Sequence, residues 1–286
     1  MGTSVQSIHS FLIRFRRNRL GVFGIIIVLT IAIGSTLPVF LPNLFHQPWA
    51  VSNDSLFPPS QIHLMGTDDL GRDVFSRFMY GAQVTLLIGL VGAFLSTLMG
   101  IFAGALSGYY GGVIDAILMR LVDMLWILPT FFVGLFVVAI FGPGLYNVIL
   151  VIGLLFWPST ARLVRAEMLS LREREFVDAM RLLGMSKMRI VFQELLPNVM
   201  SIAIANGTLQ IASGILLESG LSFLGLGDPN RPTWGFQLSQ ARPFLREAWW
   251  MALFPGLGIF LTTFSIHVIG DAVNDILNPR LRSSRK

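Results

Sequence analysis

The side chains best able to do chemistry in this chain are polar groups set inside long apolar runs. Asn206, Gln210 and Ser213 recur at the spacing of one helix face, and Glu218 follows in the same run, from Val199 to Leu226. Amide and carboxyl groups at such a depth can hydrogen-bond a polar solute, or they can bond neighbouring helices. Both interpretations stay open, and Asn206, Gln210 and Glu218 are candidates for lining a polar path.

Covalent, metal and phosphate chemistry have little support in the residue types. Cysteine is absent, which excludes disulfides, thiolate metal ligands and thiol nucleophiles. The histidines are scattered and show no ligand spacing, so no metal site is expected; they are His9, His46, His63 and His267. The chain lacks the phosphate-binding pattern GxxxxGK[ST] and the hydrolase patterns HExxH and GxSxG. We therefore expect no catalytic residue, no bound cofactor and no ATP site in this chain.

Composition predicts that lipid covers much of the folded surface. Of 286 residues, 53% are hydrophobic and only 13% charged, with a mean hydropathy of +0.69, whereas soluble domains carry about 25% charged residues. Segments of roughly 20 apolar residues can cross a bilayer as helices. Six such segments predict an all-α integral membrane protein: residues 20–41, 84–106, 116–141, 145–163, 199–226 and 249–269.

The basic residues orient these spans. If the N-terminus is cytoplasmic, 16 of the 21 Lys and Arg residues fall in cytoplasmic segments. The positive-inside rule then predicts that both termini are cytoplasmic and that the net charge of +5 marks loops, not a nucleic-acid partner.

One of these loops, residues 162–197, is a charged island between two apolar runs. It holds 12 of the 37 charged residues. Within it, Met168–Leu183 is predicted to be helical, with Phe176, Met180 and Leu183 on one face. Gly184 should end that helix in a left-handed conformation, and Ser186 should cap a second helix that leads into the fifth span. The face suits either a lipid surface or a groove on a partner protein.

The island resembles a known family motif, the EAA loop of permease subunits in ATP-driven importers. The family form is Glu-Ala-Ala, three residues, Gly, nine residues, Ile, one residue, Leu-Pro. The matching or substituted positions are Asp178, Ala179, Met180, Gly184, Glu194, Leu196 and Pro197. The chain departs from the form with Asp178 for Glu, Met180 for the second Ala and Glu194 for Ile.

Further segments resemble the second permease subunit of dipeptide, oligopeptide and nickel importers. They are MGTDDLGRDVFSRFMYGAQ (65–83), RLVDMLWILPTFF (120–132), SLREREFVDAMRLLG (170–184), LSFLGLG (221–227) and FPGLGIFLTTFSIHVIGDAVNDILNPRL (254–281). The resemblance implies a type I importer permease fold in the inner membrane, with six transmembrane helices and a cytoplasmic helix–turn–helix coupling loop.

The resemblance also implies partners and roles. The partners would be a second, homologous permease forming a heterodimer, two ATPase subunits that bind ATP-Mg, and an extracytoplasmic solute-binding protein. Peptides are the implied cargo, with nickel or a metal chelate as the alternative. The residues implied in ATPase coupling are Glu175, Phe176, Asp178, Ala179, Met180, Arg181, Leu183, Gly184, Leu196 and Pro197.

Three parts are expected along the chain. Residues 1–75 would comprise the cytoplasmic N-terminus, the first span and an external loop; residues 76–276 the permease core with five spans and the coupling loop; and residues 277–286 a basic cytoplasmic tail. A stand-alone secondary transporter is a weaker alternative, because internal repeats and several buried acidic residues are not evident.

Overall fold

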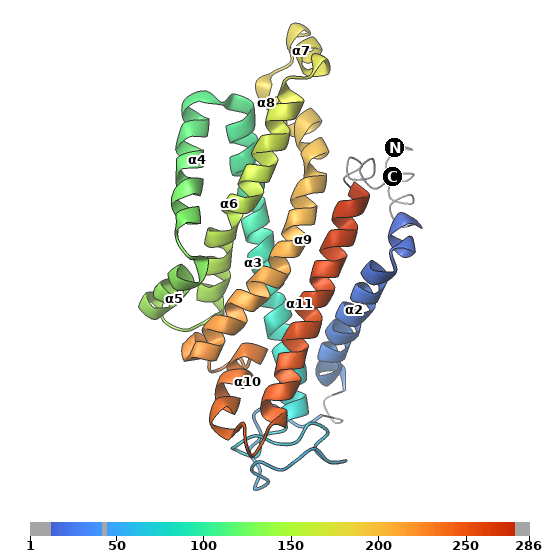
Figure 1. Cartoon of the computed structure of the whole chain (residues 1–286), viewed down its shortest axis with the longest axis vertical. Coiled ribbons are helices and arrows are strands. Elements are labelled where there is room, and N and C mark those ends of the chain that lie inside the picture. Colours follow the sequence, from blue (N-terminus) through green and yellow to red (C-terminus); the bar gives the residue numbers. More distant parts are fainter. Residues whose placement is uncertain (1–12, 42–44, 278–286) are drawn as a thin grey trace.

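A computed structural model describes residues 13–41 and 45–277, and this part of the chain is almost entirely helical (Figure 1). Residues 1–12 of the expected N-terminal segment, and the expected basic tail from residue 278 on, lie outside the described residues. The helical elements are α2 (Arg19–Phe40), α3 (Val74–Tyr110), α4 (Gly112–Ile127), α5 (Thr130–Phe141), α6 (Leu145–Arg172), α7 (Glu175–Leu182), α8 (Lys187–Arg189), η2 (Ile190–Leu195), α9 (Leu196–Leu221), η3 (Ser222–Leu226), α10 (Trp234–Ala241), η4 (Arg242–Phe244) and α11 (Trp250–Leu277).

Within the described residues, five helical segments are long and apolar enough to cross a membrane, and they confirm five of the six predicted spans. The predicted span over residues 116–141 is a broken one, because α4 and α5 are bent by 89° at Leu128–Pro129. Proline disfavours a helical conformation in the residue before it, and Leu128 is extended, with ψ 129°. When this bent pair is counted as one, the described residues contain six candidate spans.

Helices α3 and α6 pack along a row of small residues that recurs every four positions. A Cβ atom built on Gly104 would lie 2.5 Å from the carbonyl oxygen of Ala161, and one on Gly108 would lie 2.6 Å from Cβ of Met168. Small residues at this spacing let two membrane helices approach backbone to backbone. The row consists of Gly92, Ser96, Gly100, Gly104 and Gly108.

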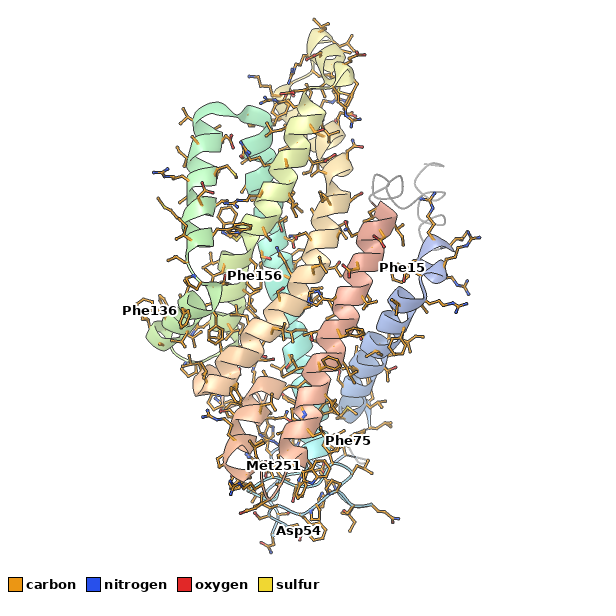
Figure 2. All side chains as sticks on the ribbon, viewed as in Figure 1. Phe15, Asp54, Phe75, Phe136, Phe156 and Met251 are labelled. Carbon is orange, nitrogen blue, oxygen red and sulfur yellow. The ribbon has the colours of Figure 1, made fainter. Side chains whose placement is uncertain are left out.

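The elements separate into two ends of an elongated bundle (Figure 1). Helix α7 lies at one end, and the first turns of α2 and the last turns of α11 are directed towards it. Helix α10 and the irregular segment before α3 lie at the opposite end. Between the ends, many large apolar side chains point outward; Phe136 on α5 is 65% exposed (Figure 2). This arrangement is the one expected of a bundle whose middle faces lipid.

Residues 45–73, before α3, form a cap that is held against α10 and α11 by polar contacts. Buried Asp68 lies 3.5 Å from Nε of Arg77, and Arg77 donates a hydrogen bond of 2.6 Å to Gln240 on α10. The indole nitrogen of Trp250 on α11 donates to the carbonyl oxygen of Thr67 at 3.0 Å. The motif of residues 65–83 therefore makes polar contacts that join distant parts of the chain.

Candidate coupling loop and polar path

The coupling loop is anchored to the bundle through the buried side of α7. Val177 is fully buried and belongs to a core cluster with Met168 of α6 and with Ile190 and Val191 of η2. Met180 packs against the same cluster. Helix α7 therefore shares a core with the ends of α6 and α9.

The predicted helix Met168–Leu183 is wrong in its continuity. Helix α6 runs on to Arg172, and α7 begins only at Glu175, because Arg174 is extended with ψ 145°. The break turns α7 so that Val177 reaches the core, an outcome of tertiary packing that helix propensity does not contain.

The predicted apolar face of Phe176, Met180 and Leu183 is divided between two surroundings. Met180 faces the protein's own core, Phe176 is 38% exposed, and Leu183 is 81% exposed. Leu182 is 89% exposed and was not singled out from the sequence. The exposed apolar edge of the loop is therefore Leu182–Leu183, at the end of α7.

The turn after α7 has the predicted chemistry. Gly184 has φ +76°, its amide donates to the carbonyl of Arg181, and the amide of Met185 donates to that of Met180. These two bonds are the Schellman pattern that closes a helix at a left-handed residue. Ser186 accepts a hydrogen bond from the amide of Arg189, which confirms its capping role.

The remaining coupling candidates lie on or just behind this surface. Glu175 and Ala179 are exposed on α7, Leu196 packs against the core cluster, and Pro197 is exposed. Pro197 lies in the first turn of α9, which follows the π-helical turn η2 without a break; the amide of Leu196 donates to the carbonyl of Val191. The wider turn accommodates a residue that has no amide hydrogen.

A groove of about 490 Å³ lies between α7 and the end of α3. Arg181 donates to Asp178 at 2.8 Å, and Arg172 donates to the carbonyl oxygen of Tyr109 at 3.1 Å. The end of α3 was not predicted to meet the loop, since more than 60 residues separate them. The lining residues are Tyr109, Tyr110, Arg172, Glu173, Asp178, Arg181 and Lys187.

In the middle of the bundle, the structure brings two of the three path candidates together. Gln210 donates to the hydroxyls of Ser159 at 2.8 Å and Thr160 at 2.9 Å, and its oxygen accepts from Ser96. Asn206 donates to Thr160 at 2.8 Å. These bonds join α3, α6 and α9, so the amides hold helices together, as one of the two interpretations predicts.

A cavity of about 280 Å³ adjoins this polar group. Gln210, Ser159 and Ser213 supply polar atoms to its wall. The other lining residues are Leu125, Trp126, Thr130, Leu155 and Phe156. The bend between α4 and α5 forms part of the wall, because Trp126 and Thr130 flank it.

Glu218 lies apart from this cavity. It is 1% exposed and accepts hydrogen bonds from Ser222 at 2.6 Å and Ser219 at 3.3 Å. Eight residues separate it from Gln210, about 12 Å along a helix that rises about 1.5 Å per residue. The structure therefore does not group Glu218 with the other two path candidates.

Two ion pairs, neither of them predicted, join α4 to α6. Arg165 makes two hydrogen bonds of 2.6 Å to the carboxylate of Asp115. Arg162 donates to Asp123 at 2.6 Å and lies 3.9 Å from the ring of Trp126. Since Trp126 also lines the cavity, these contacts position one of its walls.

Known proteins with similar sequences show the family of this chain. Residues 96–283 match the family described as the binding-protein-dependent transport system inner membrane component. A protein of Brucella abortus named as a peptide transport system permease is 39% identical over 271 residues, which cover 94% of this chain and 90% of that protein. A dipeptide transport system permease protein of Alkalihalophilus pseudofirmus is 36% identical over 273 residues, covering 94% and 89%. A protein of Brucella suis named as a peptide permease is 40% identical over 271 residues, covering 93% and 89%. The chain belongs to the family of inner-membrane components of binding-protein-dependent transport systems, as a multi-pass permease subunit.

Proposed function

We propose that this chain is one permease half of an ATP-driven peptide importer. It would pair with a second, homologous permease and with two ATPase subunits, and receive di- or oligopeptides from an extracytoplasmic binding protein. The names of the relatives support the peptide cargo. The chain has no phosphate-binding motif, so ATP-Mg binds and is hydrolysed on the partner subunits.

One observation carries the coupling role of α7. Leu182 and Leu183 are 89% and 81% exposed at the tip of a helix whose other side is buried through Val177. A short helix that is anchored on its buried side and exposes apolar residues at its tip fits the mode in which a helix enters a groove on a partner. Charged neighbours Asp178 and Arg181 favour a protein groove that is polar at its rim.

The buried anchoring of α7 would couple the ATPase subunits to the membrane helices. Closure of the ATPase subunits moves α7, and the shared core carries that movement into α6 and α9 as a rigid-body switch. Helix α6 bears the hydroxyls that bind Gln210 and Asn206, so the movement changes the cavity beside them. We orient the chain by the positive-inside rule, with α7 and both termini in the cytoplasm and the cap before α3 on the outer side.

The docking role is tested by charging the tip of α7. The double variant Leu182→Asp, Leu183→Asp should retain its level in the membrane and lose most of the ATPase that co-purifies with the wild-type complex. Val51→Asp is the matched control, because Val51 is 69% exposed in the cap at the other end. Full ATPase retention in the double variant would contradict docking through α7.

The cargo and the energy source need a separate measurement. Proteoliposomes with the whole complex and its binding protein should take up a labelled dipeptide only when ATP is supplied to the ATPase side. Uptake of Ni²⁺ without peptide uptake would favour the nickel alternative. Uptake by the chain without ATPase subunits would favour a stand-alone transporter.

A further inference from the structure

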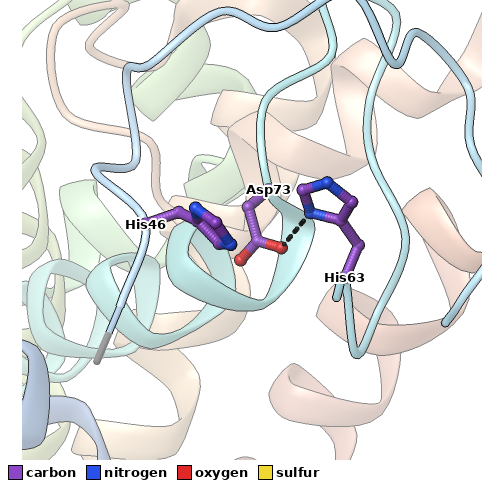
Figure 3. A group of neighbouring side chains, drawn as sticks. All are labelled: His46, His63 and Asp73. Carbon is purple, nitrogen blue, oxygen red and sulfur yellow. Dashed lines mark hydrogen bonds and ion pairs between the residues drawn. The ribbon is translucent and has the colours of Figure 1, made fainter. Parts of the chain in front are cut away.

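Two histidines that are scattered in the sequence meet in the external cap (Figure 3). His46 follows α2, His63 lies in the irregular segment, and Asp73 caps the start of α3. The ring centroids of the histidines are 5.2 Å apart, and one ligand atom of each of the three residues lies within 4.8 Å of the others. Within residues 13–41 and 45–277, no other set of histidine and acidic side chains meets this criterion.

Asp73 is prepared to offer one oxygen to a cation. Its Oδ2 accepts hydrogen bonds from the amide and the hydroxyl of Ser76, both at 2.8 Å. Its Oδ1 faces Nδ1 of His63 at 3.0 Å. The carboxylate is 4% exposed, and among the described side chains His63 is its one partner at ion-pair distance. A buried carboxylate without a lysine or arginine partner favours a positive charge beside it.

The ring of His63 is buried between the carboxylates of Asp73 and Asp54. The residue is 7% exposed, and Ser60 binds its backbone amide at 3.1 Å. While Nδ1 faces Asp73, Nε2 lies 3.8 Å from the carboxylate of Asp54. Histidines that bind metals commonly direct their second ring nitrogen to a carboxylate, which fixes the tautomer and increases ligand basicity.

We propose that His46, His63 and Asp73 form a binding site for a divalent transition metal of the zinc or nickel type on the external cap. Two imidazoles and one carboxylate suit such ions and not Mg²⁺ or Ca²⁺. Water supplies the open position. Tetrahedral bonds of about 2.0–2.2 Å place ligand atoms about 3.3–3.6 Å apart, so binding draws the exposed His46 inward. The metal fastens the segment after α2 to the start of α3.

The test measures metal binding and needs no transport. The full chain, purified with its partners through a tag without histidine, is dialysed against Zn²⁺, Ni²⁺ or Co²⁺, and bound metal is counted. We expect one saturable ion per chain, a visible Co²⁺ spectrum typical of four-coordinate sites, and no displacement by Mg²⁺. His46→Ala and His63→Ala should each weaken binding by about tenfold or more. His267→Ala, an exposed residue on α11, should bind as the wild type does.

His46→Ala keeps the test decisive if the buried His63 proves necessary for folding, because His46 is exposed. Zn²⁺ should also raise the melting temperature of the wild-type complex and leave that of His46→Ala unchanged. Absence of saturable binding, or equal binding by the wild type and His46→Ala, would overturn the metal site and leave a His63–Asp73 hydrogen bond that closes the cap. Failure of peptide transport would leave this result unaffected.

Discussion

Gly184 is the residue at which backbone conformation alone can be tested. Its φ is +76°, and an added Cβ would meet nothing within 4 Å. A left-handed conformation costs an L-residue about 1–2 kcal/mol, and β-branched side chains suffer most. We expect Gly184→Val to open the turn after α7 and to reduce ATPase retention in a pull-down, while membrane insertion stays intact.

The matched control is Gly184→Asn, because asparagine adopts the left-handed conformation more readily than other side chains. It should retain more ATPase than Gly184→Val does, at equal levels of chain in the membrane. Wild-type assembly and transport in Gly184→Val would contradict a coupling role for this turn.

Gln210 separates the structural and path-lining interpretations of the polar group. Gln210→Leu removes the partner of Ser159, Thr160 and Ser96, and each interhelical bond in a membrane protein is worth about 0.6–2 kcal/mol. We expect a lower melting temperature than for Thr208→Val, whose hydroxyl bonds only the carbonyl of Ile204 on its own helix. Slower transport at an unchanged melting temperature would instead assign Gln210 to the path.

These two residues mark what the sequence could predict at this scale. The conformation of Gly184 is local, so a helix pattern followed by glycine was sufficient. The partners of Gln210 come from α3 and α6, 50 or more residues away, and no spacing within α9 contains them. The turn at Gly184 could therefore be predicted from the sequence. The choice between helix packing and solute contact for Gln210 could not.

At the scale of elements, the packing of α3 on α6 depends on the small-residue row. A leucine at Gly104 would drive its Cβ to 2.5 Å from a backbone oxygen, which a rotamer change cannot relieve. Overpacking typically costs about 1–3 kcal/mol, and more against backbone. We expect Gly104→Leu to lower the amount of folded chain in the membrane, measured by fluorescence-detected size-exclusion chromatography.

Gly256→Leu in α11 provides the control, because an added Cβ there meets nothing within 4 Å. This variant also replaces a glycine by leucine in a membrane helix, but the added side chain does not meet the backbone of another helix. Equal loss of folded chain in both variants would assign the effect to glycine replacement itself and contradict close packing of α3 and α6.

The positions of the helices could be predicted from the sequence, but their bends and breaks could be predicted only in part. Hydropathy located the spans because burial in lipid is a property of composition. It did not reveal the 89° bend at Pro129 or the break before Glu175. A proline predicts a kink, but the angle depends on how α4 and α5 pack against α6, and the break depends on the burial of Val177.

At the scale of the whole molecule, the two ends of the bundle must lie on opposite sides of the membrane. The natural absence of cysteine allows this to be measured with single substitutions. Ile62 is 74% exposed in the cap before α3, and Leu182 is 89% exposed at the tip of α7. A membrane-impermeant maleimide added to intact cells, with the outer membrane permeabilised where one is present, should label Ile62→Cys. Leu182→Cys should react only after the inner membrane is opened.

The same pair tests assembly as well as orientation. In opened membranes, Leu182→Cys should react several-fold more slowly when the ATPase subunits are present, since docking covers the tip of α7. Ile62→Cys should be indifferent to them, because it lies at the far end of the bundle. Labelling of Leu182→Cys in intact cells would reverse the orientation, and labelling at an unchanged rate with ATPases present would place their docking surface elsewhere on the chain.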